Sequence, residues 1–245
     1  MRAHMSLLGA VAFALLAVDA GADGLEAARA AFHDGRFLEA ADLAEAEASA
    51  DGLALAAESL TVEGYFRAPE DQHQPLLSRA VALAGRAIEI DPANPQAHLQ
   101  SAHAMGRYAQ TIGVLEALNE GYASRIRAAL DQALALDPDL VAAHLSLGAW
   151  HAEIVATLGL MAGMVYGASE DEALAHYERA LALAPASAAA NLEYAIGLLT
   201  LDDDEETVAR ARARLEHALA APVEDAFGEI VHERAARRLA QLDGR

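Results

Sequence analysis

One short phrase occurs three times in this sequence, in the same register each time. Residues 133–138 read Ala-Leu-Ala-Leu-Asp-Pro, residues 180–185 read Ala-Leu-Ala-Leu-Ala-Pro, and residues 87–92 read Ala-Ile-Glu-Ile-Asp-Pro. An Ala-His-Leu or Ala-Asn-Leu step begins five residues after each proline. A small residue lies ten residues after each proline, at Ala102, Gly148 and Ala195. Such self-similarity is the signature of a repeat array, in which each unit buries its apolar side against its neighbours.

The residues of this phrase predict helices. Leu130 with Ala133, and Tyr177 with Ala180, form narrow stripes that a second helix can approach closely. The prolines cannot continue a helix, but they suit the first turn of the next one. Apolar residues make up 54% of the chain, and the alternation typical of strands is missing. We therefore predict an all-α fold in which Ala133, Ala180 and Gly148 are buried at helix crossings.

These features resemble the tetratricopeptide repeat (TPR) family, whose unit is a helix–turn–helix of about 34 residues. The resemblance implies a right-handed helical solenoid. Pro92, Pro138 and Pro185 are 46 and 47 residues apart, so each unit here is elongated. By register the additional residues lie in 111–124 and 157–169. Extended first helices followed by a compact bend would accommodate them.

A narrower resemblance begins at Gly148-x-Trp150. It continues through Val165-Tyr166-Gly167, Ala173, His176-Tyr177 and the Ala-Leu-x-Leu-x-Pro run. Together these residues are similar to the repeat domain of the regulator-of-microtubule-dynamics family, over about residues 80–201. Trp150, the single tryptophan, is expected to pack between neighbouring repeats as a core anchor.

The N-terminus has the pattern of a secretory signal. Residues 7–18 form an apolar run after a weakly basic start, and small residues suited to cleavage follow at Ala20 and Ala22. The alternative is an uncleaved membrane anchor, but a span needs roughly 20 apolar residues and this run is shorter. We therefore expect export with cleavage, a periplasmic or secreted location, and no stable membrane anchor afterwards.

Composition narrows the class of partner. The net charge is −20, from 37 acidic against 17 basic residues, which argues against nucleic acid or an anionic lipid surface. Cysteine is absent, so the exported chain has no disulfide and depends on its core. Every basic residue is arginine rather than lysine, which is typical of a high-GC bacterial coding bias.

We expect one solenoid domain after the signal peptide. The prolines and polar residues of 67–75 predict a loop, and the acidic run 202–206 is interpreted as the N-terminus of a helix rather than a calcium loop. Arg234, Arg237 and Arg238 suit the end of a closing helix. The expected divisions are a signal peptide at 1–22, a degenerate N-terminal repeat at 23–75, repeats at 76–222 and a C-terminal capping helix at 223–245.

No pattern for catalysis is found in the sequence. The ten histidines prompt a search for a metal site, but His144 and His151 are seven residues apart and lack a carboxylate at ligand spacing. His98 and His144 share a repeat position that Asn191 fills in the third copy, which favours packing or a hydrogen bond at a helix end. We predict no catalytic residue, no metal and no cofactor.

The TPR resemblance implies a binding site on the concave face, three residues before, one after and five after each small crossing residue. A protein or peptide partner is the leading interpretation, and an apolar small ligand is the alternative. A third possibility is that the chain's own inserted segments cover this face, because exposed apolar patches of that size are unusual. The residues so placed are Leu99, His103, Arg107, Leu145, Ala149, Glu153, Leu192, Ile196 and Thr200.

Overall fold

The computed structural model describes residues 20–244, so the predicted signal peptide lies almost entirely outside the described residues. Every secondary-structure element between residues 20 and 244 is helical, which confirms the all-α prediction. A π-helical turn, η1, spans Glu63–Arg67. The α-helices are α1 (Ala20–His33), α2 (Phe37–Ala46), α3 (Ala50–Val62), α4 (Glu70–Ile90), α5 (Pro95–Ile112), α6 (Val114–Asn119), α7 (Tyr122–Leu136), α8 (Val141–Leu158), α9 (Met161–Tyr166), α10 (Glu170–Leu183), α11 (Ala188–Leu201), α12 (Glu205–Ala220) and α13 (Ala226–Asp243).

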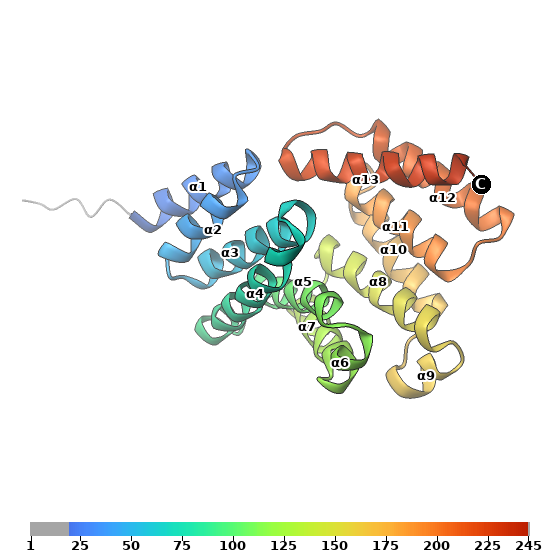
Figure 1. The fold of residues 1–245 in the computed structure, drawn as a ribbon, viewed down its shortest axis with the longest axis horizontal. Helices are drawn as coiled ribbons and strands as arrows, with labels where there is room; N and C mark the ends of the chain where they lie inside the picture. Colours follow the sequence, from blue (N-terminus) through green and yellow to red (C-terminus); the bar gives the residue numbers. More distant parts are fainter. Residues whose placement is uncertain (1–19, 245) are drawn as a thin grey trace, which may run out of the picture.

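The helices stack as a solenoid of helical pairs. Each first helix packs against its own second helix, as α8 does against α10, and also against the first helix of the next pair, as α8 does against α11. The same neighbour contacts connect α1, α3, α5, α8, α11 and α13 in turn, so these helices form a layer of their own. Figure 1 shows the resulting curve, with the first and last helices brought to the same side of the molecule.

The predicted crossings are buried. Ala133 and Ala180 have no exposed surface. A Cβ added to Gly148 would lie 2.9 Å from the ring of Tyr177, so α8 and α10 approach closely there. Trp150 is 6% exposed, and its indole Nε1 donates a hydrogen bond to the Ala123 carbonyl of the preceding repeat, at 2.9 Å. The predicted core positions are therefore confirmed.

The shared His/Asn position closes the turn between repeats. In each copy, the side chain six residues after the repeat proline donates to that proline's carbonyl oxygen. The three hydrogen bonds run from His98 to Pro92 (2.9 Å), from His144 to Pro138 (3.0 Å) and from Asn191 to Pro185 (3.4 Å). The helix-end hydrogen bond favoured by the repeat register is thus confirmed, since it satisfies a carbonyl that the proline turn leaves free.

The additional residues of each elongated repeat extend its first helix and add a short one. Both α5 and α8 are 18 residues long, and each is followed by a six-residue helix, α6 or α9. Glycines with positive φ make the bends, including Gly113 (φ 88°) and Gly121 (φ 70°) around α6. This agrees with the predicted extension and compact bend.

The predicted loop at 67–75 is wrong over most of its length. Helix α4 begins at Glu70 and contains Pro75, so the expected boundary at residue 76 falls inside a helix. Pro69 serves as the N-cap, while Glu70 and Asp71 favour a helix start through the dipole. Pro75 is tolerated because it removes only one hydrogen bond near the start of the helix.

The acidic run before α12 caps that helix, as predicted. Asp204 is its N-cap, and the carboxylate accepts a hydrogen bond from the Thr207 backbone N–H at 2.7 Å. Glu205 and Glu206 occupy the first turn, where acidic side chains interact favourably with the helix dipole.

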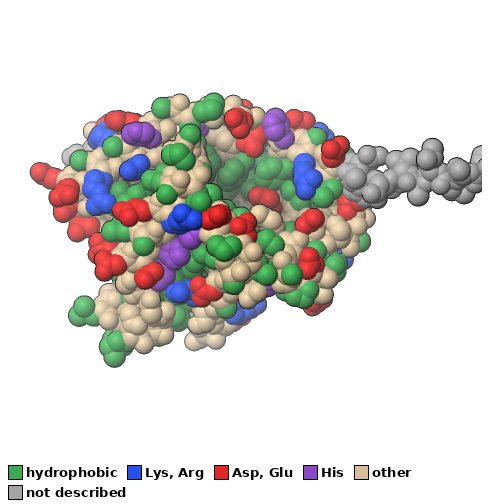
Figure 2. Space-filling model, turned by 180° about the vertical axis from the view of Figure 1, so that it is seen from behind, with side chains coloured by type: hydrophobic (Ala, Val, Ile, Leu, Met, Phe, Trp, Pro, Cys, Tyr) green, Lys and Arg blue, Asp and Glu red, His purple; other side chains and the backbone are tan. Residues whose placement is uncertain are grey.

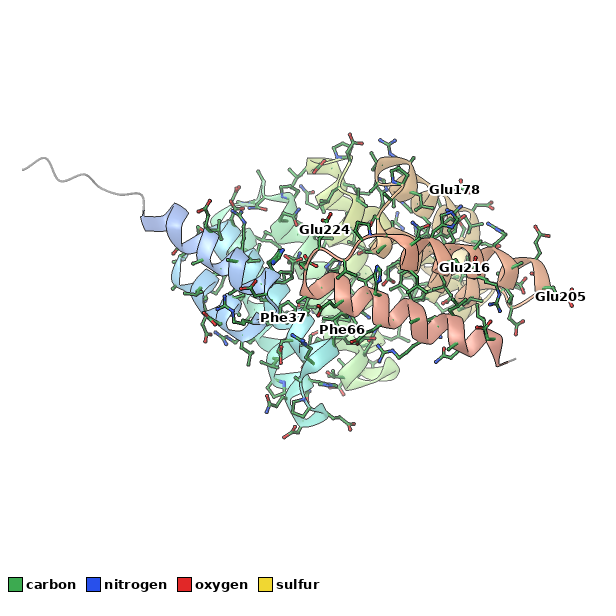
Figure 3. The ribbon with its side chains drawn as sticks, turned by 90° about the horizontal axis from the view of Figure 1, so that it is seen from above. Phe37, Phe66, Glu178, Glu205, Glu216 and Glu224 are labelled. Carbon is green, nitrogen blue, oxygen red and sulfur yellow. The ribbon has the colours of Figure 1, made fainter. Side chains whose placement is uncertain are left out.

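The last helix, α13, packs against the first helices of the chain. Phe37 and Phe66 lie where α13 meets the N-terminal elements (Figure 3). The rings of Phe66 and Phe227 are 6.4 Å apart in an edge-on arrangement. We name this cluster the closing contact; it consists of Phe32, Phe37, Val62, Phe66, Ala226, Phe227 and Ile230. The two ends of the solenoid are therefore in contact, which the sequence did not predict.

Candidate partner-binding face

Three of the predicted site residues are core residues instead. Leu99, Leu145 and Leu192 are 2%, 8% and 0% exposed and pack in the hydrophobic clusters between helices. They offer almost no surface to a partner, which corrects their assignment to an open groove. The physical reason is the close packing of successive first helices, which buries this position of each helix against its neighbours.

His103 and Arg107 lie on α5, and both have partners on other elements. His103 Nε2 is 2.8 Å from the Ser146 hydroxyl on α8. The guanidinium of Arg107 lies 3.9 Å from the centre of the Tyr65 ring in η1, an arrangement typical of a cation–π interaction. Both residues thus face the space between the first helices and η1.

The remaining predicted residues belong to α8 and α11. Ala149, Ile196 and Thr200 are half-buried, while Glu153 keeps exposed surface. Thr200 donates its hydroxyl to the Ile196 carbonyl, so this hydroxyl is used within its own helix. Among the described residues Glu153 has no ion pair, which leaves its carboxylate available.

Four residues that the sequence reasoning missed complete this surface, namely Tyr65, Phe66, Glu193 and Arg234. Arg234 of α13 forms an ion pair with Glu193 of α11 at 2.7 Å, and both side chains are largely buried. The Arg234 guanidinium also lies 5.2 Å from the centre of the Phe66 ring, next to Tyr65. Repeat spacing could have suggested Glu193, two residues before the crossing residue. The sequence assigns Arg234 to the helix dipole, and its place in this ion pair corrects that expectation.

We name this surface the inner face. It alternates between charged and aromatic side chains contributed by η1, α5, α8, α11 and α13. Its members are Tyr65, Phe66, His103, Arg107, Glu153, Glu193 and Arg234.

The charged residues of the inner face also shift one another's pKa values without direct contact. The surrounding protein displaces water from around Glu153 and raises the pKa of its carboxyl, while Arg107 lowers this pKa and Glu193 raises it further. Burial and the positive charge of Arg107 lower the pKa of His103 to about 4. His103 is therefore neutral at pH 7, and Glu153 is in an environment that favours a positively charged neighbour.

Figure 2 shows a hollow between the two halves of the molecule, with hydrophobic side chains on its floor and charged ones at its edge. Two surface pockets lie elsewhere. A pocket of about 370 Å³ lies between α10, α11 and α12, and one of about 270 Å³ lies beside the closing contact. Neither of these pockets is lined by a predicted site residue.

The histidines considered for metal binding form a cluster between α8 and α10. His144 Nδ1 and His176 Nδ1 are 2.9 Å apart, and the His151 and His176 rings are stacked at 5.9 Å. Arg127 Nη1 lies 3.2 Å from His151 Nε2, which places a positive charge where a cation would have to bind. Within residues 20–244 no group of three or more His, Cys, Asp or Glu side chains is arranged to hold a metal ion.

The chain is similar to known helical repeat proteins in sequence and in fold. A family model described as "Regulator of microtubule dynamics protein 1-3" matches residues 43–243. No curated protein matches the chain significantly. A crystal structure of a thermophilic TPR protein from Thermus thermophilus is similar, with a TM-score of 0.65 and 18% identity, covering 89% of this chain and 99% of that one. Among the described residues, no helix is long and apolar enough to cross a membrane.

Proposed function

The chain belongs to the regulator of microtubule dynamics protein 1-3 family, and on this basis we propose that it is a non-catalytic TPR-like adaptor. Its partner is a protein or peptide segment bound on the inner face. We infer the class of partner from the TPR-like fold, and we infer the binding site from the side chains that the fold brings together on this face.

The observation that supports this proposal most directly is the carboxylate of Glu153, which has no ion pair among the described residues although it interacts electrostatically with Arg107. The Glu153 carboxylate has lost part of its water, and the positive charge of Arg107 offsets this cost only in part, so a basic side chain from a partner would be favoured there. The net charge of −20 attracts basic partners over a longer range. We therefore propose a peptide that carries a basic residue next to an apolar one.

Site-specific photo-crosslinking in the native host tests this. A photoreactive residue at Ala156, exposed one turn after Glu153 on α8, should give a discrete adduct with one partner, whereas the same residue at Glu216, exposed on the outer helix α12, should give none. Glu153→Arg should abolish the adduct formed from position 156. Equal adducts at 156 and 216, or an adduct insensitive to Glu153→Arg, would contradict the proposal.

An apolar small ligand is the second candidate, because the hollow in Figure 2 has hydrophobic side chains on its floor. Native mass spectrometry of the protein from its own host distinguishes the two. A bound lipid-like mass that is lost in Ile196→Asp favours the ligand, and its absence together with a crosslinked peptide favours the adaptor.

We also propose that the chain is exported and cleaved near Ala20 or Ala22. The apolar run at 7–18 and the small residues after it support this. Cleavage after Ala22 would remove the first three residues of α1. Mass analysis of the protein from its native host should give an N-terminus at Gly21 or Asp23, and a retained Met1 would exclude export by this route.

A further inference from the structure

Four of the seven large apolar side chains that are exposed among the described residues lie at one corner of the molecule. Leu160 is 98% exposed, Met164 81%, Val165 57% and Met161 50%. The other exposed large apolar residues, such as Leu38 and Ile90, occur singly. Hydrophobic side chains stand out from the corner of Figure 2 that corresponds to α9 in Figure 1. We name these four residues the apolar tip.

A buried residue anchors the short helix α9, which carries the tip, to the rest of the fold. Ala162, on the side of α9 that turns toward the core, is 1% exposed and packs with Trp150 and Ala168. Met161, Met164 and Val165 follow at helical spacing on the outward face. The short helix therefore lies on the surface with one face anchored and its apolar face outward.

The segment of chain that carries the tip lacks charge. Residues 154–169 form the longest stretch between residues 20 and 244 without Asp, Glu, Arg or His. Of its few polar side chains, the Ser169 hydroxyl is already used as the N-cap of α10. Specific protein interfaces surround an apolar centre with a polar rim that forms hydrogen bonds, and this tip has almost none.

We propose that the apolar tip inserts reversibly into the headgroup region of a neutral, zwitterionic lipid bilayer. A fluid apolar phase needs no polar rim and no matching pocket, whereas a protein partner does. A second copy is disfavoured by area, since four such side chains provide roughly 400 Å² against about 800 Å² per partner in a stable dimer.

The charge of the molecule selects the kind of lipid. Glu170, Asp171 and Glu172 are exposed directly after the charge-free stretch, and the net charge is −20. Both repel an anionic surface. Binding should therefore be stronger to phosphatidylcholine vesicles than to vesicles in which a fifth of the lipid is phosphatidylserine.

Depth-dependent fluorescence quenching tests the insertion in the full chain. Leu160→Trp is compared with Ile90→Trp, an exposed position outside the tip, on vesicles of brominated phosphatidylcholine. The apolar run at 7–18 and the native Trp150 are common to both variants, so the difference reports the tip. The proposal predicts a blue shift and strong quenching of the indole introduced at 160 only, and equal quenching of the two variants overturns it.

A second pair of variants tests the contribution to affinity. Leu160→Ser with Met164→Ser should weaken binding to phosphatidylcholine vesicles by about tenfold or more, while Leu38→Ser with Ile90→Ser should leave it unchanged. Circular dichroism checks that each variant is folded. Equal binding of the two pairs overturns the proposal, as does dimerisation that depends on the tip without vesicle binding. Stronger binding to phosphatidylserine vesicles overturns the choice of lipid.

Discussion

Tyr177 is held between two glycines of neighbouring helices. A Cβ at Gly148 would lie 2.9 Å from its ring, and one at Gly197 would lie closer still, 2.5 Å from its Cζ and hydroxyl oxygen. The ring also stacks on Tyr194, with centroids 5.2 Å apart. Burial raises the pKa of the Tyr177 hydroxyl well above its usual value, so the side chain stays neutral. One buried ring thus sets the separation of α8, α10 and α11.

This geometry predicts an order among three Gly→Ala substitutions. Gly197→Ala should destabilise the fold by about 1–3 kcal/mol, because a rigid ring must move. Gly148→Ala should cost less, and Gly85→Ala should stabilise by about 0.5–1 kcal/mol, since nothing lies within 4 Å of its added Cβ. Urea denaturation gives the three values. A Gly197→Ala variant as stable as Gly85→Ala would show that the ring moves aside freely.

Buried histidines predict a loss of stability in acid. Burial, Arg127 and His176 together lower the pKa of His151 to about 4, against about 6.5 in an unfolded chain. The unfolded chain therefore takes up a proton first as the pH falls, and stability is lost between about pH 6.5 and 4.

The variant His151→Gln removes this titration. The free energy of unfolding of the parent should fall more steeply from pH 7 to 5 than that of the variant, with a difference of about 1–3 kcal/mol. The comparison of slopes cancels other groups, including Glu58, whose pKa burial and the Asp225 charge raise to about 7. Parallel pH profiles would mean that folding does not lower the pKa of His151.

At the scale of elements, the sequence predicted the helix ends and helix lengths that depend on residues close together in the chain. The helix ends just before Pro92, Pro138 and Pro185, and the extension of α5 and α8, follow from local chemistry that recurs in register. The start of α4 was missed because proline was interpreted as a breaker. A capping Pro69 and two acids outweigh the one hydrogen bond that Pro75 removes.

The same reasoning gives a prediction for α4. Pro75 is exposed, so Pro75→Ala should lose no packing and should restore an N–H donor to the Asp71 carbonyl. We expect stabilisation by about 1–3 kcal/mol, with the neighbouring exposed substitution Gln74→Ala as the control. Thermal unfolding measures both. A lower melting temperature for Pro75→Ala would indicate that the proline is needed for the turn from η1.

At the scale of the whole molecule, the inner face could be predicted only in part. His103, Arg107 and Glu153 follow from repeat register, because each lies on one helix of the array. Phe66 and Arg234 meet only because the solenoid closes, and no local pattern records a contact between residues so far apart in the chain. Leu99, Leu145 and Leu192 were wrongly predicted to be accessible, because the repeat register predicts which helix face they occupy but not how closely the next helix packs against it.

Closure of the solenoid gives the last prediction. Ile230 is 8% exposed in the closing contact, so Ile230→Asp places an unpaired charge between α13 and the N-terminal helices. Each repeat depends mainly on its neighbours, so the helices should persist while the two ends separate. Small-angle scattering should then show a larger radius of gyration at nearly unchanged helicity, with faster hydrogen exchange in α13 and α1. Val223→Asp, at an exposed position just before α13, is the matched control. Unfolding of the whole chain by Ile230→Asp alone would instead show that the closing contact is part of one cooperative core.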